Sequence, residues 1–442
     1  MRNLNIRVVA SIAILVIGLT ATIAALGSAS PADSSYGILI DYGDYDIVYS
    51  PEDGDLQPLD ALKDTCGSFG IELSLESGEV VSIGGHSGDG ERSWRLYVVE
   101  QGSKEWSTVS DPSSISSYVA VCYGYCEDGG TPSPAVDSTG YNFYSYGTPT
   151  RVVSLAPSCT ESLCAVGGTD AIVGTDYYSN YPKEIVDRRS SGDIAGVGGF
   201  TNPSYEAILS LDPDLVVCIG SQSSHLHVAE KLRAVGIDVL VMDGGESTDS
   251  VLNNIYQAGV VLGSASASVD LIESLDEEIE RIGEVVDGSG QDDKRVMMAL
   301  SAVKSPWVAG SDTYASDVFY VAGASNIYSG ESGWVQVNAE TIAKLDPEVI
   351  IIVTSDYDAT QEGYDSMLSS MSSEWKGTTA YRTGEIYLFT GDASDCASRP
   401  GPRIAQLAEL VSRAVHGDAF SDGLPKFVGD NYLDYLTIAK EV

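Results

Sequence analysis

Apolar runs and amphipathic segments alternate along the chain after about residue 150. Each run is short and rich in β-branched residues, and a longer segment with helical spacing separates it from the next. The strand-like runs lie at residues 151–155, 171–173, 215–219, 239–241, 296–300, 349–353 and 386–388. Apolar strands that alternate with helices are typical of parallel sheets covered on both faces. The pattern therefore predicts an α/β fold with mainly parallel sheets.

The N-terminal third shows a different pattern. Over residues 35–126, β-type runs follow one another with turn residues between them, and a single short helical pattern interrupts them. The runs lie at 38–40, 71–75, 80–83, 94–99 and 117–123, and the helical pattern covers 59–65. These elements predict a small α+β domain. Residues 127–149, which begin with a stretch rich in Pro, Gly and Ser, are predicted to be a linker.

The α/β region contains an internal repeat. Residues 205–217 have the sequence YEAILSLDPDLVV, and residues 339–351 have the sequence AETIAKLDPEVII. Each copy is a short helix, a Leu-Asp-Pro turn that ends it, and a buried strand. The repeat predicts two similar lobes, at 150–246 and 294–416. A cleft between two such lobes is a usual place for a ligand.

A continuous helical pattern over residues 247–287 lies between the two lobes. It begins at the N-cap cluster of Ser247, Thr248 and Asp249 and ends at Asp287 and the glycine that follows. A helix of this length would connect the lobes as a stiff strut. Residues 417–442 are predicted to be a C-terminal extension.

Residues 1–30 have the features of an export signal or an N-terminal membrane anchor. Arg2 and Arg7 precede an apolar run from Val8 to Leu26, and small residues follow it. About 20 apolar residues can span a bilayer, so the run is long enough to remain as an anchor. Positive charge before the run places the body of the protein outside. We expect an exported protein, extracellular or periplasmic, that meets the membrane only through this segment or a permease.

Charge and composition exclude several classes of function. The chain carries 64 acidic and 24 basic residues, a net charge of -40, which would repel nucleic acid. It contains no nucleophile elbow, no phosphate-binding loop and no zinc-protease motif, so we expect no catalytic residues, no metal site and no cofactor. Only four histidines occur, and His225 and His227 are predicted to lie on a surface helix.

The seven cysteines suit an exported protein only in part. Cys66, Cys122 and Cys126 lie in the N-terminal third, where one pair could form a disulfide, and the sequence leaves the pairing open. The other four lie in apolar or helical contexts and are interpreted as small buried residues: Cys159, Cys164, Cys218 and Cys396.

Residues 151–161, with the sequence RVVSLAPSCTE, and the repeated Leu-Asp-Pro turn resemble the substrate-binding proteins of ABC importers for cobalamin, iron-siderophores and haem. The resemblance covers residues 150–416. It implies the class III binding-protein fold, in which two α/β lobes are joined by one long helix. It also implies an ABC permease and its ATPase subunit as partners, and no enzymatic activity. In this family one glutamate on each lobe faces the permease, and Glu206 and Glu340 occupy those positions in the two repeats.

The resemblance is closest to the cobalamin-binding members. Residues 178–182, with the sequence YSNYP, are similar to a Tyr-Ser-Asp-Tyr-Pro motif of those proteins. Phe200 and Trp334 lie six residues before the docking glutamates, where those members have a Trp, and Asp395 and Arg399 keep the spacing of an Asp and an Arg at the cleft. The resemblance thus implies a corrinoid ligand, such as vitamin B12, contacted by Tyr178, Tyr181, Phe200, Trp334, Asp395 and Arg399.

The chemistry of these residues suits a corrin ring. Aromatic faces can cover a broad apolar ring, and a few polar groups can orient the amides on its rim. Phe200 and Trp334 could instead be core aromatics. The alternative ligand is another metal chelate, either haem with Tyr178 or Tyr181 as its axial ligand, or an anionic ferric siderophore bound by Arg399 and Arg403.

The N-terminal domain carries a second resemblance. Residues 77–85, 94–99 and 119–125 are similar to the β-grasp-like domain at the C-terminal end of transcobalamin and intrinsic factor, although the Gly-Asp before that family's last strand is missing. The resemblance implies a small domain that also contacts a corrinoid. A spacer or protein-contact module is the alternative.

Overall fold

The computed structural model describes residues 36–42, 47–52, 57–68, 70–100, 107–110, 118–128, 137–139, 149–262, 264–421 and 423–442. The predicted export signal and most of the predicted linker lie outside these residues. Among the helices described, none combines the length and the apolar character needed to cross a membrane.

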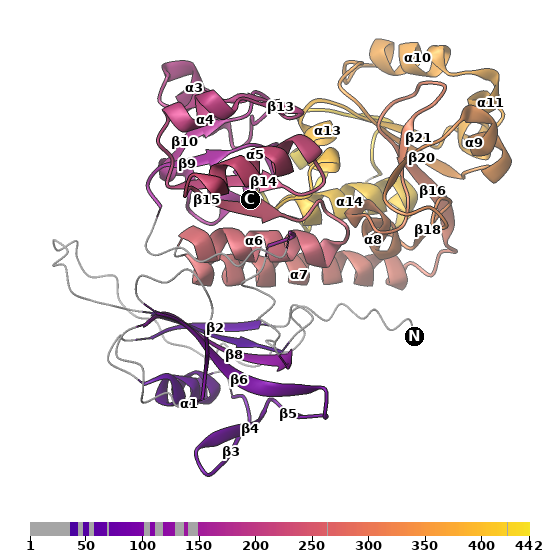
Figure 1. Ribbon diagram of the computed structural model, residues 1–442. Coiled ribbons are helices and arrows are strands. Elements are labelled where there is room, and N and C mark those ends of the chain that lie inside the picture. Colours follow the sequence, from indigo (N-terminus) through magenta and orange to yellow (C-terminus); the bar gives the residue numbers. More distant parts are fainter. Residues whose placement is uncertain are drawn as a thin grey trace.

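A small α+β domain forms the N-terminal part of the described chain (Figure 1). Its main sheet has the order β2-β1-β8-β6-β7, in which β1 and β8 are parallel and the other neighbours antiparallel. The elements are β1 (Tyr36–Asp41), β2 (Ile47–Glu52), α1 (Pro58–Ser68), β6 (Arg92–Glu100), β7 (Ser107–Val109) and β8 (Tyr118–Glu127), with a second sheet of β3 (Leu73–Glu76), β4 (Glu79–Ile83) and β5 (His86–Ser87). The predicted α+β class is confirmed, and the likeness to transcobalamin stays a prediction.

The two faces of this main sheet pack against different partners. Leu62 of α1 packs with Val121 and Tyr123 of β8 in the domain's own core. Cys122 and Tyr97 point to the opposite face and belong to the core that contains the helix joining the two lobes. Side chains alternate between faces along a strand, so one strand serves both cores.

The same alternation excludes the predicted disulfide. All seven cysteines are free thiols. Cys66 packs in the core on the α1 face, whereas Cys122 and Cys126 pack on the other face. Cys122 and Cys126 lie four residues apart on one strand, which separates them by about 13 Å, beyond the reach of a disulfide. The bridge that the sequence left open among these three cysteines is therefore not formed in the structure.

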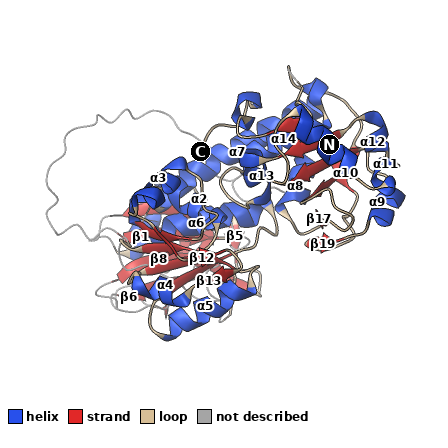
Figure 2. Cartoon of the chain, turned by 90° about the horizontal axis from the view of Figure 1, so that it is seen from above, coloured by secondary structure: helices blue, strands red, loops and turns tan. Residues whose placement is uncertain are grey.

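The first lobe is built on a parallel sheet with the order β11-β10-β9-β14-β15. Helices α2 and α6 cover one face of it and α4 and α5 cover the other (Figure 2). The elements are β9 (Val152–Ser154), α2 (Pro157–Ala165), β10 (Ile172–Thr175), α3 (Lys183–Ser191), β11 (Ala195–Gly196), the ribbon of β12 (Gly198–Gly199) and β13 (Asn202–Pro203), α4 (Tyr205–Ser210), β14 (Leu215–Ile219), α5 (Ser223–Ala234) and β15 (Asp238–Met242).

The connection between the lobes is two helices, not the one helix predicted over residues 247–287. Helix α6 (Thr248–Leu262) packs on the first lobe, and α7 (Ala265–Gly288) runs from that lobe to the second. Ser264 separates them, and its backbone N–H donates to the oxygen of Gly259 at 2.7 Å. The apolar spacing continues across the break, so periodicity alone did not show it. The long joining helix itself is confirmed as α7.

The second lobe has a sheet with the order β19-β17-β16-β20-β21-β22 and with β18 beside β16. It is parallel except at β17 and β19. Its elements are β16 (Lys294–Ala299), β17 (Trp307–Ala309), α8 (Tyr314–Val321), β18 (Ala324–Asn326), β19 (Trp334–Gln336), α9 (Ala339–Leu345), β20 (Val349–Val353), α10 (Gln361–Ser370), α11 (Ser373–Lys376), α12 (Thr379–Thr383), β21 (Ile386–Phe389), α13 (Gly391–Ser398), α14 (Ile404–Val415) and β22 (Phe427–Val428).

The predicted C-terminal extension is part of this lobe. Strand β22 pairs in parallel with β21. Further on, the backbone N–H groups of Thr437, Ile438 and Ala439 donate to the buried carboxylate of Glu409, at 2.7, 2.9 and 2.8 Å. The lobe therefore continues well beyond residue 416, the limit given by the resemblance.

The internal repeat extends to the contacts of its turns. Arg151 donates from its side chain to the carbonyl of Leu211, and Arg295 donates in the same way to that of Leu345. Asp212 and Asp346, which follow these leucines, both have left-handed backbone angles, with φ of 46° and 48°. The duplication seen in the sequence is thus a duplication of structure.

Candidate functional site

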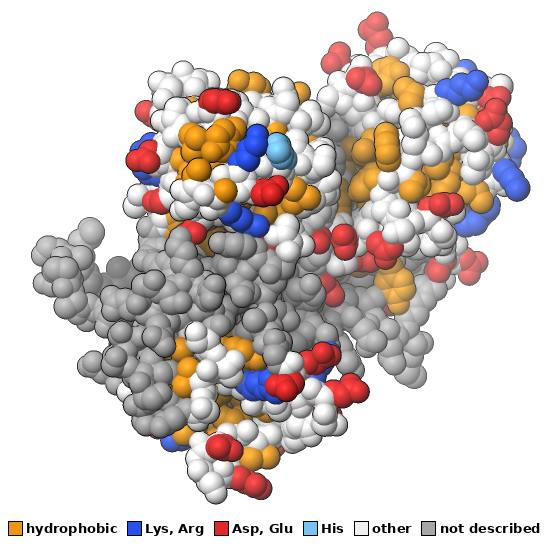
Figure 3. Space-filling model, viewed as in Figure 1, with side chains coloured by type: hydrophobic (Ala, Val, Ile, Leu, Met, Phe, Trp, Pro, Cys, Tyr) orange, Lys and Arg blue, Asp and Glu red, His pale blue; other side chains and the backbone are white. Residues whose placement is uncertain are grey.

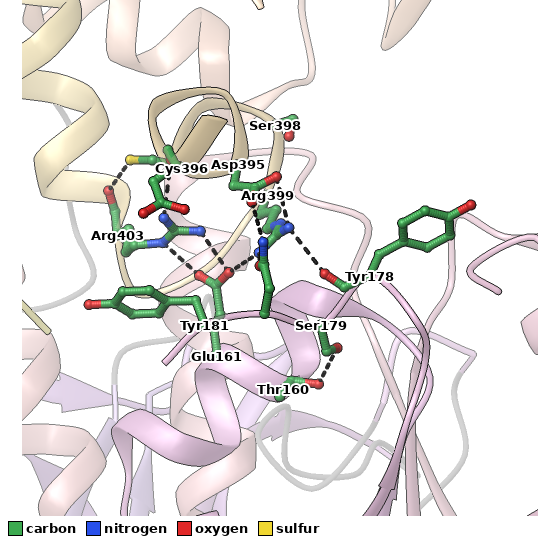
Figure 4. A network of polar contacts seen from close by, with 12 residues as sticks. Thr160, Glu161, Tyr178, Ser179, Tyr181, Asp395, Cys396, Ser398, Arg399 and Arg403 are labelled. Atoms are coloured by element: carbon green, nitrogen blue, oxygen red, sulfur yellow. Dashed lines mark hydrogen bonds and ion pairs between the residues drawn. The ribbon is translucent and has the colours of Figure 1, made fainter. Parts of the chain in front are cut away.

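A network of charged side chains joins the two lobes next to α13 (Figure 4). Glu161 on α2 of the first lobe accepts from Arg403 at 2.7 and 2.9 Å and from Arg399 at 2.9 Å, both in the second lobe. Glu161 and Arg403 are almost fully buried. Burial alone would lower the pKa of Arg403, but the Glu161 carboxylate outweighs it and raises that pKa above its usual value.

Two of the predicted ligand residues lie in this network. Arg399 ends α13 and forms an ion pair with Asp395, one helical turn earlier, at 2.8 Å. Asn180 donates to Asp395 at 2.8 Å and accepts from Arg399 at 2.6 Å. Arg399 also donates to the backbone oxygen of Tyr178 at 3.3 Å. These contacts hold the side chains of Asp395 and Arg399 in fixed positions. Both side chains remain partly exposed.

Tyr181 lies on the inner side of the network. The guanidinium of Arg403 lies 4.5 Å from the centre of its ring, and its hydroxyl donates to the backbone oxygen of Val442 at 2.7 Å. Burial raises the pKa of Tyr181 to about 12. Its hydroxyl has a protein partner, so the structure gives Tyr181 a packing role at the junction.

Tyr178 points away from the network, and its side chain is 62% exposed. A Cβ placed on Gly199 would lie 3.6 Å from the Tyr178 ring. The ring therefore lies beside the β12–β13 ribbon, whose turn carries Phe200. Gly198, with φ of 117°, allows this tight turn, because a Cβ there would lie 2.6 Å from the oxygen of Asn202. Tyr178 and Phe200 are thus neighbours on the first lobe.

On the second lobe, Trp334 begins the edge strand β19. Its ring lies 6.3 Å from that of Tyr314, whose hydroxyl donates to the carbonyl of Ala397 on α13 at 2.9 Å. Trp334 is therefore linked to α13 through one buried ring. The structure brings the side chains of Asp395 and Arg399 together and places the Tyr178 backbone, but not its ring, against Arg399. Phe200 lies near the Tyr178 ring on the first lobe, and Trp334 is connected to α13 only through Tyr314.

Trp307 is a further aromatic residue that the sequence analysis missed. It lies opposite Gln336 in the β17–β19 pair, while Trp334 lies opposite Ala309. Paired residues lie on the same face of a sheet, so Trp307 shares a face with Gln336. Residues two apart on a strand also share a face, so Trp334 lies on that face as well. Trp307 is 50% exposed. The signal in the sequence was a Trp directly after Pro306, a residue that often precedes a strand.

The space-filling view shows the surface hollowed between the two lobes (Figure 3). The N-terminal domain lies on the other side of α6 and α7 from α13 (Figure 1). In this arrangement the small domain does not line the region around Arg399. The prediction that the small domain also contacts a corrinoid stays a prediction.

Glu206 and Glu340 occupy equivalent positions in the two lobes. Each is the second residue of a short helix, and the side chain of the preceding N-cap residue, Ser204 or Asn338, accepts from a backbone N–H in that helix. Both glutamates are exposed. Negative side chains in a first turn suit the helix dipole, so this position alone does not establish a docking role.

Two α/β lobes joined by a long helix, with charged and aromatic residues where they meet, define a two-lobed solute-binding protein. A family model described as periplasmic binding protein matches residues 152–393, and the chain belongs to this family. The family consists of transport components that are not enzymes and that act outside the cytoplasm.

Named relatives agree with this assignment. The chain is 28% identical to an uncharacterized ABC transporter substrate-binding lipoprotein, YvrC, of Bacillus subtilis over 62% of this chain and 82% of that protein. It is 27% identical to a cobalamin-binding protein of Halobacterium salinarum, over 61% and 70%. Among solved structures, a periplasmic heme binding protein from Pseudomonas aeruginosa matches with a TM-score of 0.54 and 22% identity, over 63% and 96%.

Proposed function

We propose that this protein is the substrate-binding component of an ABC importer and that it captures a corrinoid in the groove between its lobes. The predicted contacts are Tyr178, Phe200 and Trp334, with Trp307 added from the structure. Asp395 and Arg399 supply the polar groups. Tyr181 supports the site from inside. The ligand is then delivered to a permease and its ATPase subunit.

The observation that carries the choice of ligand is that the arginines at the junction already have carboxylate partners. Arg399 pairs with Glu161 and Asp395, and Arg403 pairs with Glu161, at distances below 3 Å. The carboxyl groups of Asp392 and Asp176 also act on Arg399. An anionic ferric siderophore would need cations that are free to pair with it. A largely neutral ligand with amide groups can instead accept from Arg399 or donate to Asp395 without breaking the buried pairs.

The exposed aromatic residues favour a broad, flat ligand. Tyr178 and Trp307 are both at least half exposed, although large aromatic side chains gain more by burial than most residues do. A macrocycle placed against them would remove this surface from water. The cobalamin-binding relative from Halobacterium salinarum supports the same ligand class.

Haem is the second candidate, because the exposed phenol of Tyr178 could serve as an axial ligand. The other candidates are less suitable as axial ligands. The hydroxyl of Tyr181 is hydrogen-bonded to the backbone oxygen of Val442, and the buried ring of His225 is hydrogen-bonded to that of Phe200. The fold is shared with a heme binding protein, but at 22% identity this likeness concerns the fold alone. Tyr178→Phe would abolish an axial bond and the associated absorption band while leaving corrinoid binding largely intact.

Calorimetric titration with cyanocobalamin, cobinamide, haemin and a ferric siderophore tests the proposal. We expect cyanocobalamin to bind, and Trp334→Ala to weaken it by at least about tenfold, as for a central aromatic anchor. Tyr320→Ala is the control: Tyr320 is another aromatic residue of the second lobe, more exposed than the partly buried Trp334, and it lies at the end of α8 where the next residue, Val321, packs beside α7. Binding of haemin or the siderophore alone would reject the corrinoid and retain the importer.

Glu206 and Glu340 are proposed to pair with basic residues of the permease, one from each lobe. Ion pairs of this kind mainly set the register and the rate of encounter. The predicted export signal would place the protein outside the membrane, where such docking takes place.

A further inference from the structure

His225 connects the turn that carries Phe200 to the end of a buried strand. The residue lies in the first turns of α5 and is completely buried. The helix start agrees with the sequence prediction, but the surface position does not. Its ring nitrogens face two backbone groups from different elements, so the imidazole is held at both ends.

The two hydrogen bonds require one form of the ring. Nδ1 lies 3.3 Å from the backbone nitrogen of Ile219, whose N–H can only donate, so Nδ1 accepts. Nε2 lies 2.7 Å from the carbonyl oxygen of Phe200, which can only accept, so Nε2 donates. The neutral imidazole with its proton on Nε2 satisfies both groups. An imidazolium would direct a proton at the Ile219 N–H.

The contact with Phe200 also involves the rings. The two ring centres lie 5.2 Å apart with the planes inclined at 74°, an edge-to-face arrangement. His225 therefore holds both the backbone and the side chain of Phe200. The pairing of β12 with β13 holds the two ends of the turn, and the contact with His225 holds Phe200 between them.

We propose that His225 is a positioning residue for the ligand: its neutral imidazole fixes Phe200 in the orientation that contacts the corrinoid, and protonation releases it. The proposal rests on the proposed function, because it assumes that Phe200 lines the site. Beyond the proposed function, it predicts that the affinity for the ligand falls at acidic pH because His225 becomes protonated.

The direction of the pH effect follows from the surroundings of His225. Burial lowers the pKa of His225 below 6.5 and outweighs the opposing effect of the Phe200 carbonyl. The neutral imidazole, with its hydrogen bonds to Ile219 and Phe200, is therefore present above the pKa of His225 in the folded protein. It is lost as the pH falls through that pKa. On β14, burial raises the pKa of the adjacent Cys218 to about 12, so this group stays a thiol.

The other charged groups on the neighbouring elements do not bond to the ring in the part of the chain described. Lys231 lies over the ring of Tyr205, and Arg233 pairs with Asp137. His227 and Glu230 on α5 and Glu206 on α4 have no hydrogen bond to His225 among the described residues. Asp238 lies opposite Leu215, at the other end of the β14–β15 pair from Ile219.

Two substitutions separate the bonds. Gln places an amide nitrogen near the position of Nε2, so His225→Gln keeps the donor to Phe200 and loses the acceptor for Ile219. Asn places an oxygen near Nδ1, so His225→Asn keeps the acceptor and loses the donor. With cyanocobalamin as the probe, we expect His225→Asn to weaken binding about fivefold, the size of one hydrogen bond, and His225→Gln to stay within about twofold of the wild type.

The pH profile provides the second measurement. The affinity of the wild type should fall below pH 6.5, whereas that of His225→Gln should not show this step. Equal affinities of the wild type and both variants would overturn the proposal. So would equal losses in both variants together with lower unfolding midpoints, which would indicate a general structural role. Should His225→Asn fail to fold, the profiles of the wild type and His225→Gln decide the question.

Phe200→Ala distinguishes this inference from the proposed function. If Phe200→Ala leaves cyanocobalamin affinity unchanged, Phe200 is not a ligand contact, and the proposed site and the role of His225 both fall. If Phe200→Ala weakens binding but the two His225 variants behave alike, the site stands and only the positioning role is rejected.

Discussion

The two lobes meet at two junctions that differ in charge. Next to α13, Arg399 and Arg403 are balanced by Glu161 and Asp395. At the linking helix, three partly buried carboxyl groups come from different helices, namely Asp249 on α6, Asp276 on α7 and Asp317 on α8. Asp317 raises the pKa of Asp249, and Asp249 raises the pKa of Asp276. All the charged groups that shift the pKa values of these three are acidic.

The difference indicates how each junction depends on pH. At α13 opposite charges are paired across the junction, and these pairs hold the lobes together. At the linking helix, burial and then Asp249 raise the pKa of Asp276 to about 7. One oxygen of Asp276 is buried without a hydrogen-bond partner. The folded state is therefore more stable when Asp276 is protonated than when it is ionised.

The largest effect is expected at the balanced junction. Glu161→Gln would leave Arg399 and Arg403 without their shared carboxylate, and breaking a buried pair in this way typically costs about 3–5 kcal/mol. The free energy of unfolding from denaturant titration measures the loss. Glu385→Gln is the control, because Glu385 pairs with Lys426 at a similar 2.8 Å but both are about one-third exposed. That pair should be worth about 1 kcal/mol or less. Similar losses in both variants would show that burial at the junction adds nothing.

The sequence predicted most of the scaffold on which this junction is built. The central parallel strands of both lobes, the turn repeated at Asp212 and Asp346, and the equivalent positions of Glu206 and Glu340 follow from local patterns. The short strands β11, β12, β13, β17, β18, β19 and β22 were not predicted. Those features depend on neighbours in the chain, which a sequence displays directly.

Features that depend on distant residues were missed. Glu161 meets Arg403 across 242 positions, and nothing near either residue indicates the other. The pairing of β22 with β21 and the burial of His225 are of the same kind. The break at Ser264 differs, since the Gly-Ser pair at 263–264 was a local signal that the continuing apolar period outweighed.

A smaller effect, of opposite sign, is expected at the linking helix. The folded pKa of Asp276 lies above its ordinary value of 3.8, so the native state binds the proton more tightly than the unfolded chain. Stability from this group is complete below about pH 4 and declines as the pH rises towards 7. Asp276→Asn removes the decline, so at pH 8 the variant should be more stable than the wild type by at least about 1 kcal/mol.

Unfolding curves at several pH values measure this difference. The advantage of Asp276→Asn should grow between about pH 4 and 7 and stay constant above. Asp287→Asn, at the exposed end of the same helix, changes the net charge equally and serves as the control. A constant difference at all pH values would contradict the role assigned to the acidic junction.

The smallest effect on stability is expected for Glu206 and Glu340, the glutamates proposed to dock on the permease, one from each lobe. Replacing both by Ala, in Glu206→Ala with Glu340→Ala, should leave the unfolding free energy within about 0.5 kcal/mol and the cyanocobalamin affinity unchanged, because both side chains are exposed. Docking to the permease, measured as ATPase stimulation in reconstituted vesicles, should fall. The control is Glu230→Ala with Glu362→Ala, which removes one exposed glutamate from each lobe elsewhere.

If the α13 junction fixes the distance between the two docking sites, Glu161→Gln should weaken docking as well, although it leaves both glutamates in place. Normal docking by Glu161→Gln, together with its expected loss of stability, would show that the junction holds the fold without setting the spacing of the lobes.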